Sequence, residues 1–389
     1  MQTLTNSSSI PLIPRFLDLS ALLRKKSYFL FGPRQTGKTF LIRQNLQNAR
    51  VYNLLDQSLF LSLSRNLSLI RQQTANEKSW IVVDEIQRLP DLLNEIQLMI
   101  EEQGKRFLLT GSSARKLRKG GVNLLGGRLR TQHLHPFSFW ELKEHFNLNH
   151  ALNRGLIPSI YFSDDVEADL QSYAGTYLQQ EIIAEGATRN APAFSRFLRV
   201  AALSSGTVIN FTTVANEAQV PRTTLYEYFE ILKDTLVLHE LPAWKESVKR
   251  KPIVSSKYYF FDTGVTRILQ GRPKYVQGTA EFGQAFEAFI FHELTAYRDY
   301  QFYQPLYFWR SIAKHEVDFI IGGHTAVEVK AKTNIVSQDL NSLTALGEEA
   351  KMKRLLCVCL EPKRRKVGHI EILPYQEFLQ ALWSGQYRK

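Results

Sequence analysis

The sequence predicts an α/β protein built from several units. Apolar runs of strand length alternate with helical stretches over the first 145 residues, which is the order of a parallel sheet flanked by helices. A helix–turn–helix pattern follows in the middle of the chain, and a long helix with two short strands follows residue 281. A chain of 389 residues has room for two or three such units, each with its own core.

The composition is that of a globular protein with an unusual charge. Hydrophobic residues make up 44% of the chain and charged residues 22%, which are ordinary values, but the net charge is +12. Such an excess favours a polyanionic partner, and nucleic acid ahead of a membrane because no basic amphipathic stretch stands out. The alternative is a solvated basic surface that binds no partner.

The sequence contains no pattern for export or membrane insertion. Residues 1–9 lack a charged start and an apolar core, so no signal peptide is expected, and no apolar run approaches the length of a membrane span. Cys357 and Cys359 lie two apart on an expected strand and are too few for a zinc site. We therefore expect buried thiols in a cytoplasmic protein.

The motif that organises the chain lies at residues 32–39. It reads G-x-x-x-x-G-K-T, between an apolar run at 28–31 and the start of a helix at 40. Two glycines permit a tight turn, so that backbone N–H groups and the helix N-terminus point at phosphates. We expect Lys38 to reach the β- and γ-phosphates of ATP and the Thr39 hydroxyl to hold Mg²⁺; the alternative is a glycine-rich connection that binds nothing. The expected nucleotide-binding residues are Gly32, Pro33, Arg34, Gln35, Thr36, Gly37, Lys38 and Thr39.

Two acids end the apolar run at residues 80–85, which is typical of a strand buried on both faces of a parallel sheet. Ligands bind at that end of such strands, so we expect Asp84 to contribute to the Mg²⁺ site and Glu85 to polarise the attacking water. The alternative is that both acids cap a helix at 86–100. After the next strand, Thr110 and Ser112 are equal candidates to orient that water.

A basic region follows the fourth expected strand. Arg128 stands on a glycine-rich turn, where it is a candidate finger that stabilises transition-state charge across a subunit interface. A surface arginine or a DNA contact is an equal alternative. The segment 115–121 carries four positive charges and no acid, which fits either a phosphate-backbone contact or a solvated loop.

The middle of the chain has the order of a winged helix. Helices are expected at 194–202, at 212–218 with a threonine cap, and at 223–232 after a turn containing proline, and a strand follows at 236–241. The basic stretch 245–251 falls where a wing would be. The residues expected to contact DNA are Arg222, Thr223, Thr224 and Tyr226. The alternative is a packing adaptor between domains, because Glu227 and Glu230 would repel phosphate.

A second group of acids occupies the C-terminal third. Phe282, Phe286, Phe289, Ile290 and Leu294 recur at helical spacing with Glu287 at the edge of the stripe. Strands at 316–321 and 326–330 then supply Asp318, Glu328 and Lys330, with Glu328 and Lys330 on one face. An acid followed by E-x-K on the next strand is the layout of the PD-(D/E)xK nuclease core, in which Asp318, Glu328 and Glu287 would bind Mg²⁺ and Lys330 would steady the nucleophile. A hairpin with a surface ion pair would look similar.

The order of these parts resembles the bacterial and archaeal AAA+ ATPases that are usually known only as ATP-binding proteins. Their C-terminal half is a restriction-endonuclease-like domain of unknown function. The resemblance covers nearly the whole chain, and its order is more specific than any single motif. The matching stretches are residues 32–39, 83–87, 109–113, 127–129, 135–138, 260–264, 283–287, 316–319 and 327–330.

The resemblance implies an AAA+ ATPase domain at 1–145, a helical connector at 146–190, a winged helix at 191–272 and a nuclease-like domain at 273–389. It also implies a homo-oligomer, with a ring as one form. Glu293 is an alternative to Glu287 as a metal ligand. We expect ATP and Mg²⁺ as cofactors and an ATPase that translocates or remodels DNA. The alternatives are an ATP-regulated metal-dependent DNA nuclease and a nucleotide-gated protein-interaction switch.

Overall fold

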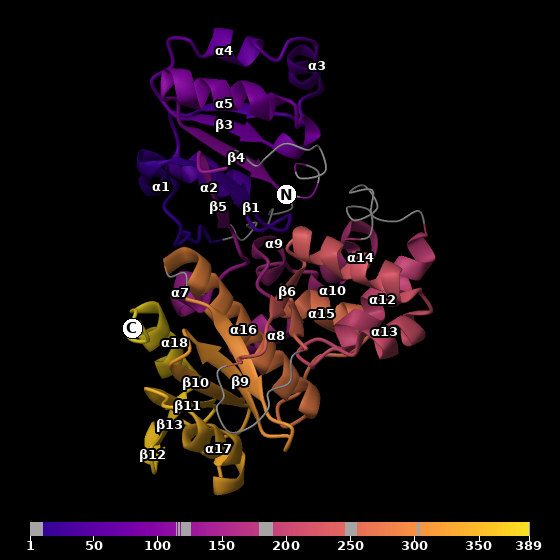
Figure 1. Cartoon of the computed structure of the whole chain (residues 1–389), viewed down its shortest axis with the longest axis vertical. Coiled ribbons are helices and arrows are strands. Elements are labelled where there is room, and N and C mark those ends of the chain that lie inside the picture. Colours follow the sequence, from indigo (N-terminus) through magenta and orange to yellow (C-terminus); the bar gives the residue numbers. More distant parts are fainter. Residues whose placement is uncertain are drawn as a thin grey trace, which may run out of the picture.

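The computed structural model describes residues 11–113, 115, 117, 126–178, 190–245, 255–301 and 304–388. Of the basic segment 115–121 it describes Arg115 and Leu117, and of the expected wing only Lys245; the rest of both predictions lies outside the described residues. Figure 1 shows the N-terminal residues at the top of the molecule, the C-terminal residues at the bottom and the central helices at one side.

The N-terminal part is a five-stranded parallel sheet with the strand order β2-β3-β4-β1-β5. Its strands are β1 (Ser27–Phe31), β2 (Arg50–Asn53), β3 (Ile81–Asp84), β4 (Phe107–Gly111) and β5 (Leu129–His133). Its helices are α1 (Leu19–Lys25), α2 (Lys38–Asn45), α3 (Gln57–Arg65), α4 (Leu69–Gln73), the 3-10 turn η1 (Ile86–Arg88) and α5 (Leu92–Gln103). Two separate hydrophobic clusters cover the two faces of the sheet, as expected for strands that carry continuous apolar runs. The predicted α/β fold with a parallel sheet is confirmed.

Short helices connect this sheet to the centre of the molecule. They are α7 (Phe139–Leu142), η2 (Lys143–His145), α8 (Leu148–Asn153), α9 (Pro158–Tyr161), α10 (Val166–Gln171) and the π-helical turn η3 (Ser172–Tyr177). Ser138 and Glu141 form a capping box that starts α7. The later helices share one hydrophobic cluster with the central helices, so the described parts of residues 157–265 form one packed unit.

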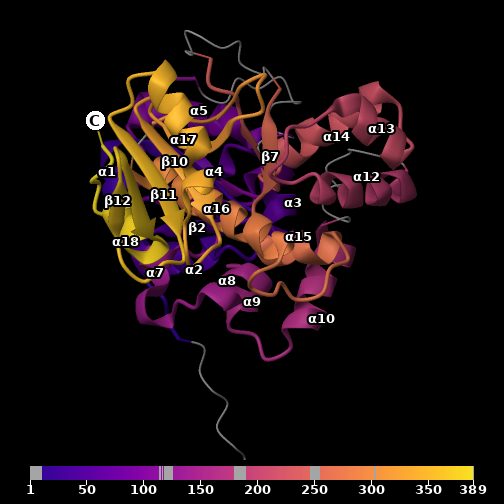
Figure 2. The same ribbon diagram turned by 90° about the horizontal axis from the view of Figure 1, so that it is seen from below.

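The central elements come in the order that the sequence predicts. They are α12 (Ala191–Leu203), α13 (Phe211–Ala218), α14 (Arg222–Asp234), the antiparallel strands β6 (Leu238–Leu241) and β7 (Lys257–Phe260), and α15 (Thr263–Leu269). Figure 2 shows α12, α13 and α14 together at the edge of the molecule, away from the C-terminal sheet. One detail differs from expectation: Asn210 caps α13 through bonds from the N–H groups of Thr212 and Thr213, whereas a threonine cap was expected.

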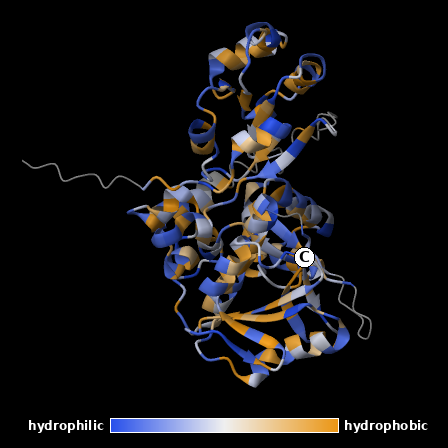
Figure 3. Ribbon diagram, turned by 90° about the vertical axis from the view of Figure 1, so that its left-hand side faces the viewer, coloured by the Kyte–Doolittle hydropathy of each residue, from blue (hydrophilic) through white to orange (hydrophobic). Residues whose placement is uncertain are grey.

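The C-terminal part is a six-stranded mixed sheet with the order β12-β13-β11-β10-β9-β8. Its strands are β8 (Leu306–Arg310), β9 (Glu316–Ile321), β10 (Thr325–Lys330), β11 (Arg354–Cys359), β12 (Arg365–Val367) and β13 (Ile370–Pro374). Its helices are α16 (Ala280–Gln301), the 3-10 turn η4 (Ser337–Leu340), α17 (Asn341–Glu349) and α18 (Tyr375–Trp383). Hydrophobic residues gather along the strands of this sheet, at the bottom of Figure 3. Cys357 and Cys359 are buried free thiols on β11, as predicted.

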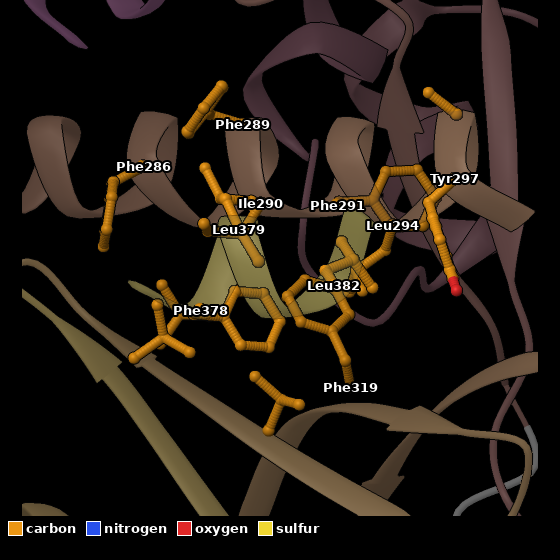
Figure 4. Packing of buried hydrophobic residues seen from close by; sticks show 14 of the residues in the cluster. Phe286, Phe289, Ile290, Phe291, Leu294, Tyr297, Phe319, Phe378, Leu379 and Leu382 are labelled. Atoms are coloured by element: carbon orange, nitrogen blue, oxygen red, sulfur yellow. The ribbon is translucent and has the colours of Figure 1, made fainter. Parts of the chain in front are cut away.

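The long helix α16 packs on one face of this sheet beside α18. All five residues of the predicted apolar stripe are at most 1% exposed. Figure 4 shows Ile290 and Leu294 of α16 on the side of the helix that faces Phe378 and Leu382 of α18. The C-terminal end of α16 extends to β5 of the first sheet, so one helix contacts both sheets.

One expectation about the first sheet is wrong in its details. The stretch after Asp84 is not a helix that begins at residue 86: it is the short turn η1, and α5 begins at Leu92. Glu85 makes no side-chain capping bond to that turn. The two acids therefore do not serve as the caps of a helix at 86–100.

None of the described helices, over the ranges given above, combines the length and the hydropathy that crossing a bilayer requires.

Candidate nucleotide site and carboxylate cluster

The glycine-rich loop joins β1 to α2 and is folded around the lysine of the motif. Gly37 has φ of 92°, a conformation that glycine adopts without strain. Lys38 Nζ donates to the carbonyl oxygens of Gly32 at 2.6 Å and Pro33 at 3.1 Å. Thr36 Oγ1 also donates to Pro33 O, at 2.7 Å. The ammonium group thus lies inside the loop, where the strand–loop–helix motif is expected to bind phosphates.

Asp84 lies at the carboxyl end of β3, at the same edge of the sheet as the loop. Its side chain is buried, and Thr110 at the end of β4 donates a hydrogen bond to Oδ1. Thr39 is exposed at the start of α2. A carboxylate and a hydroxyl are the oxygen donors that Mg²⁺ prefers beside nucleotide phosphates, so the donor set fits this ion. Thr39 and Asp84 would hold it, and the ion would neutralise phosphate charge.

Glu85 is held by Gln87, which was not among the predicted site residues. Gln87 Nε2 donates to Glu85 Oε2 and lies 3.4 Å from Ser112 Oγ. Glu85 itself has φ of 61°, a strained conformation for a residue with a side chain. A Cβ atom at Gly111 would collide with Gln87 Oε1, so the glycine at the end of β4 makes room for this side chain.

The two equal candidates for orienting the water are therefore distinguished by their contacts. Thr110 bonds to Asp84, and Ser112 is linked to Glu85 through Gln87. Gln87 is two residues after Glu85, in a stretch already singled out by its resemblance to known ATPases, so this position was available as a signal.

Arg15, in the segment before α1, contacts the phosphate loop and links it to the start of α7. Its guanidinium donates to Thr36 O at 2.5 Å and His135 O at 2.6 Å, and its Nε pairs with Glu141 at 2.9 Å. It also lies over the ring of Phe137, 5.2 Å from the centroid. No motif marks Arg15, so sequence patterns did not point to it.

A cavity of about 270 Å³ lies beside the loop. This volume is close to the lower limit of about 300 Å³ for small-molecule pockets. The wall is mainly apolar and includes two exposed side chains, Leu12 and Phe40. The lining residues are Pro11, Leu12, Ile13, Arg15, Gly37, Phe40, Phe137, Pro158, Ser159 and Phe162.

Three polar contacts connect this site to the central helices. Ser159 of α9 donates to Gln35 Oε1 at 2.9 Å, and Tyr173 of η3 donates to Arg34 O at 3.2 Å. Beyond β4, Arg115 pairs with Asp234 at the end of α14 at 3.3 Å. The loop and the end of β4 are thus both in contact with the part of the chain that carries α14.

The candidate arginine finger is engaged within its own domain. Arg128 pairs with Glu101 of α5, and both side chains are partly exposed, at 42% and 39%. Arg128 precedes β5, the edge strand beside β1.

The residues expected to contact DNA lie on the first turns of α14. Arg222, Thr223 and Tyr226 are exposed and Thr224 is half-buried. Arg222 donates to Tyr226 Oη at 2.9 Å, and the Tyr226 ring stacks on Phe211 with centroids 4.5 Å apart. These contacts hold an arginine and an aromatic ring at the outer surface of the helix.

The predicted nuclease-like residues come together between α16, β9 and β10. Lys330 Nζ donates to Glu328 Oε1 at 2.5 Å, and Asp318 Oδ2 accepts from the N–H of Val329 at 2.8 Å. Burial and the neighbouring Glu328 raise the pKa of Asp318 well above its ordinary value. Burial likewise raises the pKa of Glu328 to about 7, against the opposing effect of Lys330.

A second lysine, which no motif in the sequence marks, lies among these acids. Lys257 of β7 has only 1% of its side chain exposed, and its Nζ is 2.6 Å from Glu316, 3.3 Å from Glu287 and 4.0 Å from Asp318. Burial opposes its charge, but the carboxylates, Glu287 first, hold the pKa of Lys257 well above its ordinary value. Tyr259 also donates to Glu287, at 2.6 Å. The acids and both lysines are called the carboxylate cluster below.

Glu293, the alternative metal ligand, makes other contacts. One carboxylate oxygen accepts from the N–H of Phe139 at 2.7 Å and the other from Trp383 Nε1 at 2.8 Å. Burial raises the pKa of Glu293 to about 8. Its role in the structure is to join α16 to α7 and α18.

A group of histidines lies where the C-terminal end of α16 meets the first sheet. Asp299 Oδ2 is 2.7 Å from His135 Nε2 and 3.3 Å from His133 Nδ1, and the rings of His239 and His292 lie 5.8 and 6.2 Å from that of His135. Burial lowers the pKa values of His135 and His239, and lowers that of His292 to about 3. The sequence offered no signal for this group, because its members are far apart in the chain.

Comparison with known families decides the identity of the first domain. Residues 24–143 match the model of a family described as an AAA domain. This part of the chain is a P-loop AAA-type ATPase domain. Residues 145–275 and 282–378 match two further models, both described as domains of unknown function (DUF8612 and DUF4143).

Similar proteins were found in bacteria and archaea. The uncharacterized protein Rv2008c of Mycobacterium tuberculosis is 26% identical over 337 residues, which cover 83% of this chain and 74% of that protein. The uncharacterized protein MJ1544 of Methanocaldococcus jannaschii is 24% identical over 336 residues, which cover 78% and 73%. Their similarity extends beyond the AAA domain.

One solved structure is a signal transduction ATPase with numerous domains (STAND) from Pyrococcus horikoshii, which has a tetratricopeptide repeat sensor. The match covers 74% of this chain but only 46% of that one, with 14% identity and a TM-score of 0.24. At this TM-score the likeness carries no weight for the present chain.

Proposed function

We propose that this protein hydrolyses Mg-ATP and uses the cycle to translocate or remodel DNA. The observation that carries the ATPase part is the arrangement at one edge of the parallel sheet. The loop that encloses Lys38 lies at the same edge of the sheet as Asp84 and Glu85. A hydrogen bond from Thr110 orients Asp84, and a hydrogen bond from Gln87 orients Glu85. Phosphoryl transfer relies on such positioning, because the protein contributes mainly placed charges to the reaction.

The cavity beside the loop supports a nucleotide in preference to inorganic phosphate. It is apolar and lies next to Gly37, and Phe40 offers an aromatic face at its edge. We propose that the base of the nucleotide enters this cavity while the phosphates occupy the loop. A base there would contact α9 through Pro158, so nucleotide binding would draw the connector toward the first domain.

The DNA part of the proposal rests on charge and on the surface of α14. The chain carries a net charge of +12, and the first turns of α14 expose Arg222, Thr223 and Tyr226. Arginine binds phosphate or guanine, and an aromatic ring can stack on a base. The contact between Arg115 and Asp234 offers a route from the end of β4 to this helix.

A nucleotide-gated protein switch is the second candidate. Glu227 and Glu230 are exposed on the same helix and would repel a phosphate backbone. In that case α14 would bind a protein partner, and the Arg115–Asp234 contact would transmit the nucleotide state to it.

Measuring ATP hydrolysis against a panel of DNA structures tests these candidates. The panel holds single strands, duplexes, forks and junctions, with wild type, Glu85→Gln and Arg222→Ala. We expect wild type to be stimulated by at least one DNA, Glu85→Gln to bind ATP without hydrolysing it, and Arg222→Ala to keep basal hydrolysis but lose stimulation. Hydrolysis without stimulation and without DNA affinity at low salt would contradict the DNA role, and a protein captured only in one nucleotide state would then favour the switch.

We also propose that the protein is a homo-oligomer, with a ring as one form, in which Arg128 reaches the neighbouring nucleotide. The ion pair with Glu101 is exposed and therefore weak, so its exchange for a phosphate contact would cost little. Light scattering with and without ATP tests the assembly. The test of the finger is to mix Arg128→Ala with Glu85→Gln subunits: activity should reappear only if the two residues act across an interface.

A further inference from the structure

We propose that the carboxylate cluster is a site for the chain's own Lys257 ammonium group and does not bind a catalytic metal ion. Three observations carry this inference: the position of the ammonium group, the balance of charge around it, and the element from which Lys257 comes. The inference is independent of the proposed ATPase cycle.

The ammonium group lies among the oxygens that a metal would need. It is closest to Glu316 at 2.6 Å, then to Glu287 at 3.3 Å and Asp318 at 4.0 Å. The ammonium donates to acceptors of this kind, and Glu316 and Glu287 lie within hydrogen-bond distance of it, whereas Mg²⁺ requires oxygens at about 2.0–2.1 Å in a regular octahedron. In the described part of the chain, where the Lys257 ammonium occupies the space between these acids, no three acidic, histidine or cysteine side chains form a group that could hold a metal ion. The residues present therefore do not fit the metal of a PD-(D/E)xK nuclease.

Charge also favours the lysine over a metal. Four carboxylates, those of Glu287, Glu316, Asp318 and Glu328, lie beside three cations. The cations are Lys257, Lys330 paired with Glu328, and Arg310, which is 3.4 Å from Glu316. A divalent ion would add two positive charges next to an ammonium that is itself buried, and the repulsion between like charges is strong at short range.

The backbone of Lys257 is held in a strand at the edge of the carboxylate cluster. Lys257 is the first residue of β7, paired with Leu241 of β6, and its Nζ lies 5.5 Å from the centroid of Phe308. Tyr259, two residues on, bonds to Glu287 and stacks on Phe291 with centroids 4.2 Å apart. The strand that follows the central helices is thus fastened to the C-terminal sheet. The ion pairs of the carboxylate cluster join β7 to the C-terminal sheet.

Binding of Mn²⁺ to the nucleotide-free protein tests the proposal. Electron paramagnetic resonance measures this binding as the loss of the signal of free Mn²⁺. The variants are Asp318→Asn, Lys257→Met and the double variant, with Lys330→Met as the matched removal of the neighbouring lysine. We expect wild type and Asp318→Asn to bind Mn²⁺ equally, since the cluster contributes no site. We expect Lys257→Met to gain a site at least tenfold tighter than any in wild type, which the double variant loses, and Lys330→Met to gain none.

An Mn²⁺ site in wild type that disappears in Asp318→Asn would overturn the proposal, and so would nicking of plasmid by wild type that Asp318→Asn abolishes. Wild type and Asp318→Asn decide this point even if Lys257→Met does not fold. A folded Lys257→Met protein that gains no site would also overturn it, because the carboxylates would then not form a metal site even without the ammonium.

Discussion

Arg15 and Glu141 form an ion pair that is almost completely buried, with Nε 2.9 Å from Oε1 and 1% of each side chain exposed. The pair joins the segment before the first helix to the start of α7, and Arg15 also holds the carbonyl group of Thr36 in the phosphate loop. A motif of eight residues thus depends on two residues that lie 17 positions before it and 102 after it, at 15 and 141.

Arg15→Met is expected to destabilise the protein by about 3–5 kcal/mol, because it leaves the Glu141 carboxylate buried without its partner. Nucleotide affinity should fall as well, since the loop loses its support. Urea unfolding and a fluorescent-nucleotide titration measure the two effects. The control is Arg364→Met, which breaks a pair with Glu371 in which the side chains are 68% and 39% exposed, and it should cost less than about 1 kcal/mol. Similar losses in both variants would contradict the role of Arg15.

Thr110→Val is expected to lower the affinity for Mg²⁺ or the hydrolysis rate by about 10–100-fold, as removal of a group that orients a metal ligand usually does. The valine keeps the shape of the buried side chain but cannot bond to Asp84. A Mg²⁺ titration of ATP hydrolysis provides the measurement. Thr131→Val, at an exposed position on β5, serves as the control and should leave the titration unchanged. An unchanged titration in Thr110→Val would mean that the Asp84 carboxylate is oriented without this bond.

Arg222→Ala is expected to weaken DNA binding and to reduce the slope of log affinity against log salt by about 1, if the guanidinium contacts one phosphate. Fluorescence anisotropy at several salt concentrations measures both quantities. Arg71→Ala removes an equal charge from α4 of the ATPase domain and should leave the slope unchanged. Equal effects of the two variants would point to diffuse attraction by net charge.

Acid is expected to destabilise the protein through His292. Burial lowers its folded-state pKa to about 3, against about 6.5 in the unfolded chain, so the unfolded state takes up a proton first as the pH falls. Stability should therefore decline below about pH 6.5, by about 2 kcal/mol at pH 5 from this residue alone.

His292→Gln retains a donor for the carbonyl group of Phe137, which His292 Nε2 contacts at 2.9 Å, and does not titrate. Urea unfolding at pH 7 and pH 5 should give a smaller pH effect in this variant than in wild type. His369→Gln, at an exposed histidine, should keep nearly the full wild-type effect. An unchanged pH dependence in His292→Gln would show that other groups dominate acid sensitivity.

Local patterns predicted the elements well but not the contacts between them. The apolar runs, the phosphate loop and the stripe on α16 each carry their own periodicity, so the strands, the loop and the buried face followed from short stretches. The positions of Gln87, Arg15 and Lys257 did not. Gln87 could have been predicted, because it belongs to the same sequence stretch as Asp84 and Glu85.

Arg15 and Lys257 act on residues more than 20 positions away in the sequence. A single basic residue forms no periodic pattern that would mark its position. The carboxylate cluster shows the consequence most clearly. The spacing of Asp318, Glu328 and Lys330 correctly brought these residues together, yet the side chain that fills the space between the acids comes from a strand more than 50 residues earlier. Pattern alone therefore identified the acids but did not point to Lys257.

The helix α16 sets a geometric condition on the whole molecule. Near one end it carries Glu287 of the carboxylate cluster. Near the other end it carries Asp299, which contacts His135, just after β5 of the first sheet. Since each residue of an α-helix advances the direction of its side chain by about 100°, the separation of 12 residues between 287 and 299 fixes their relative orientation. One alanine inserted between them would turn one end away from its partners by more than a quarter of a circle. Register along this helix, and not only the identity of its residues, thus determines whether both junctions can form in the same molecule.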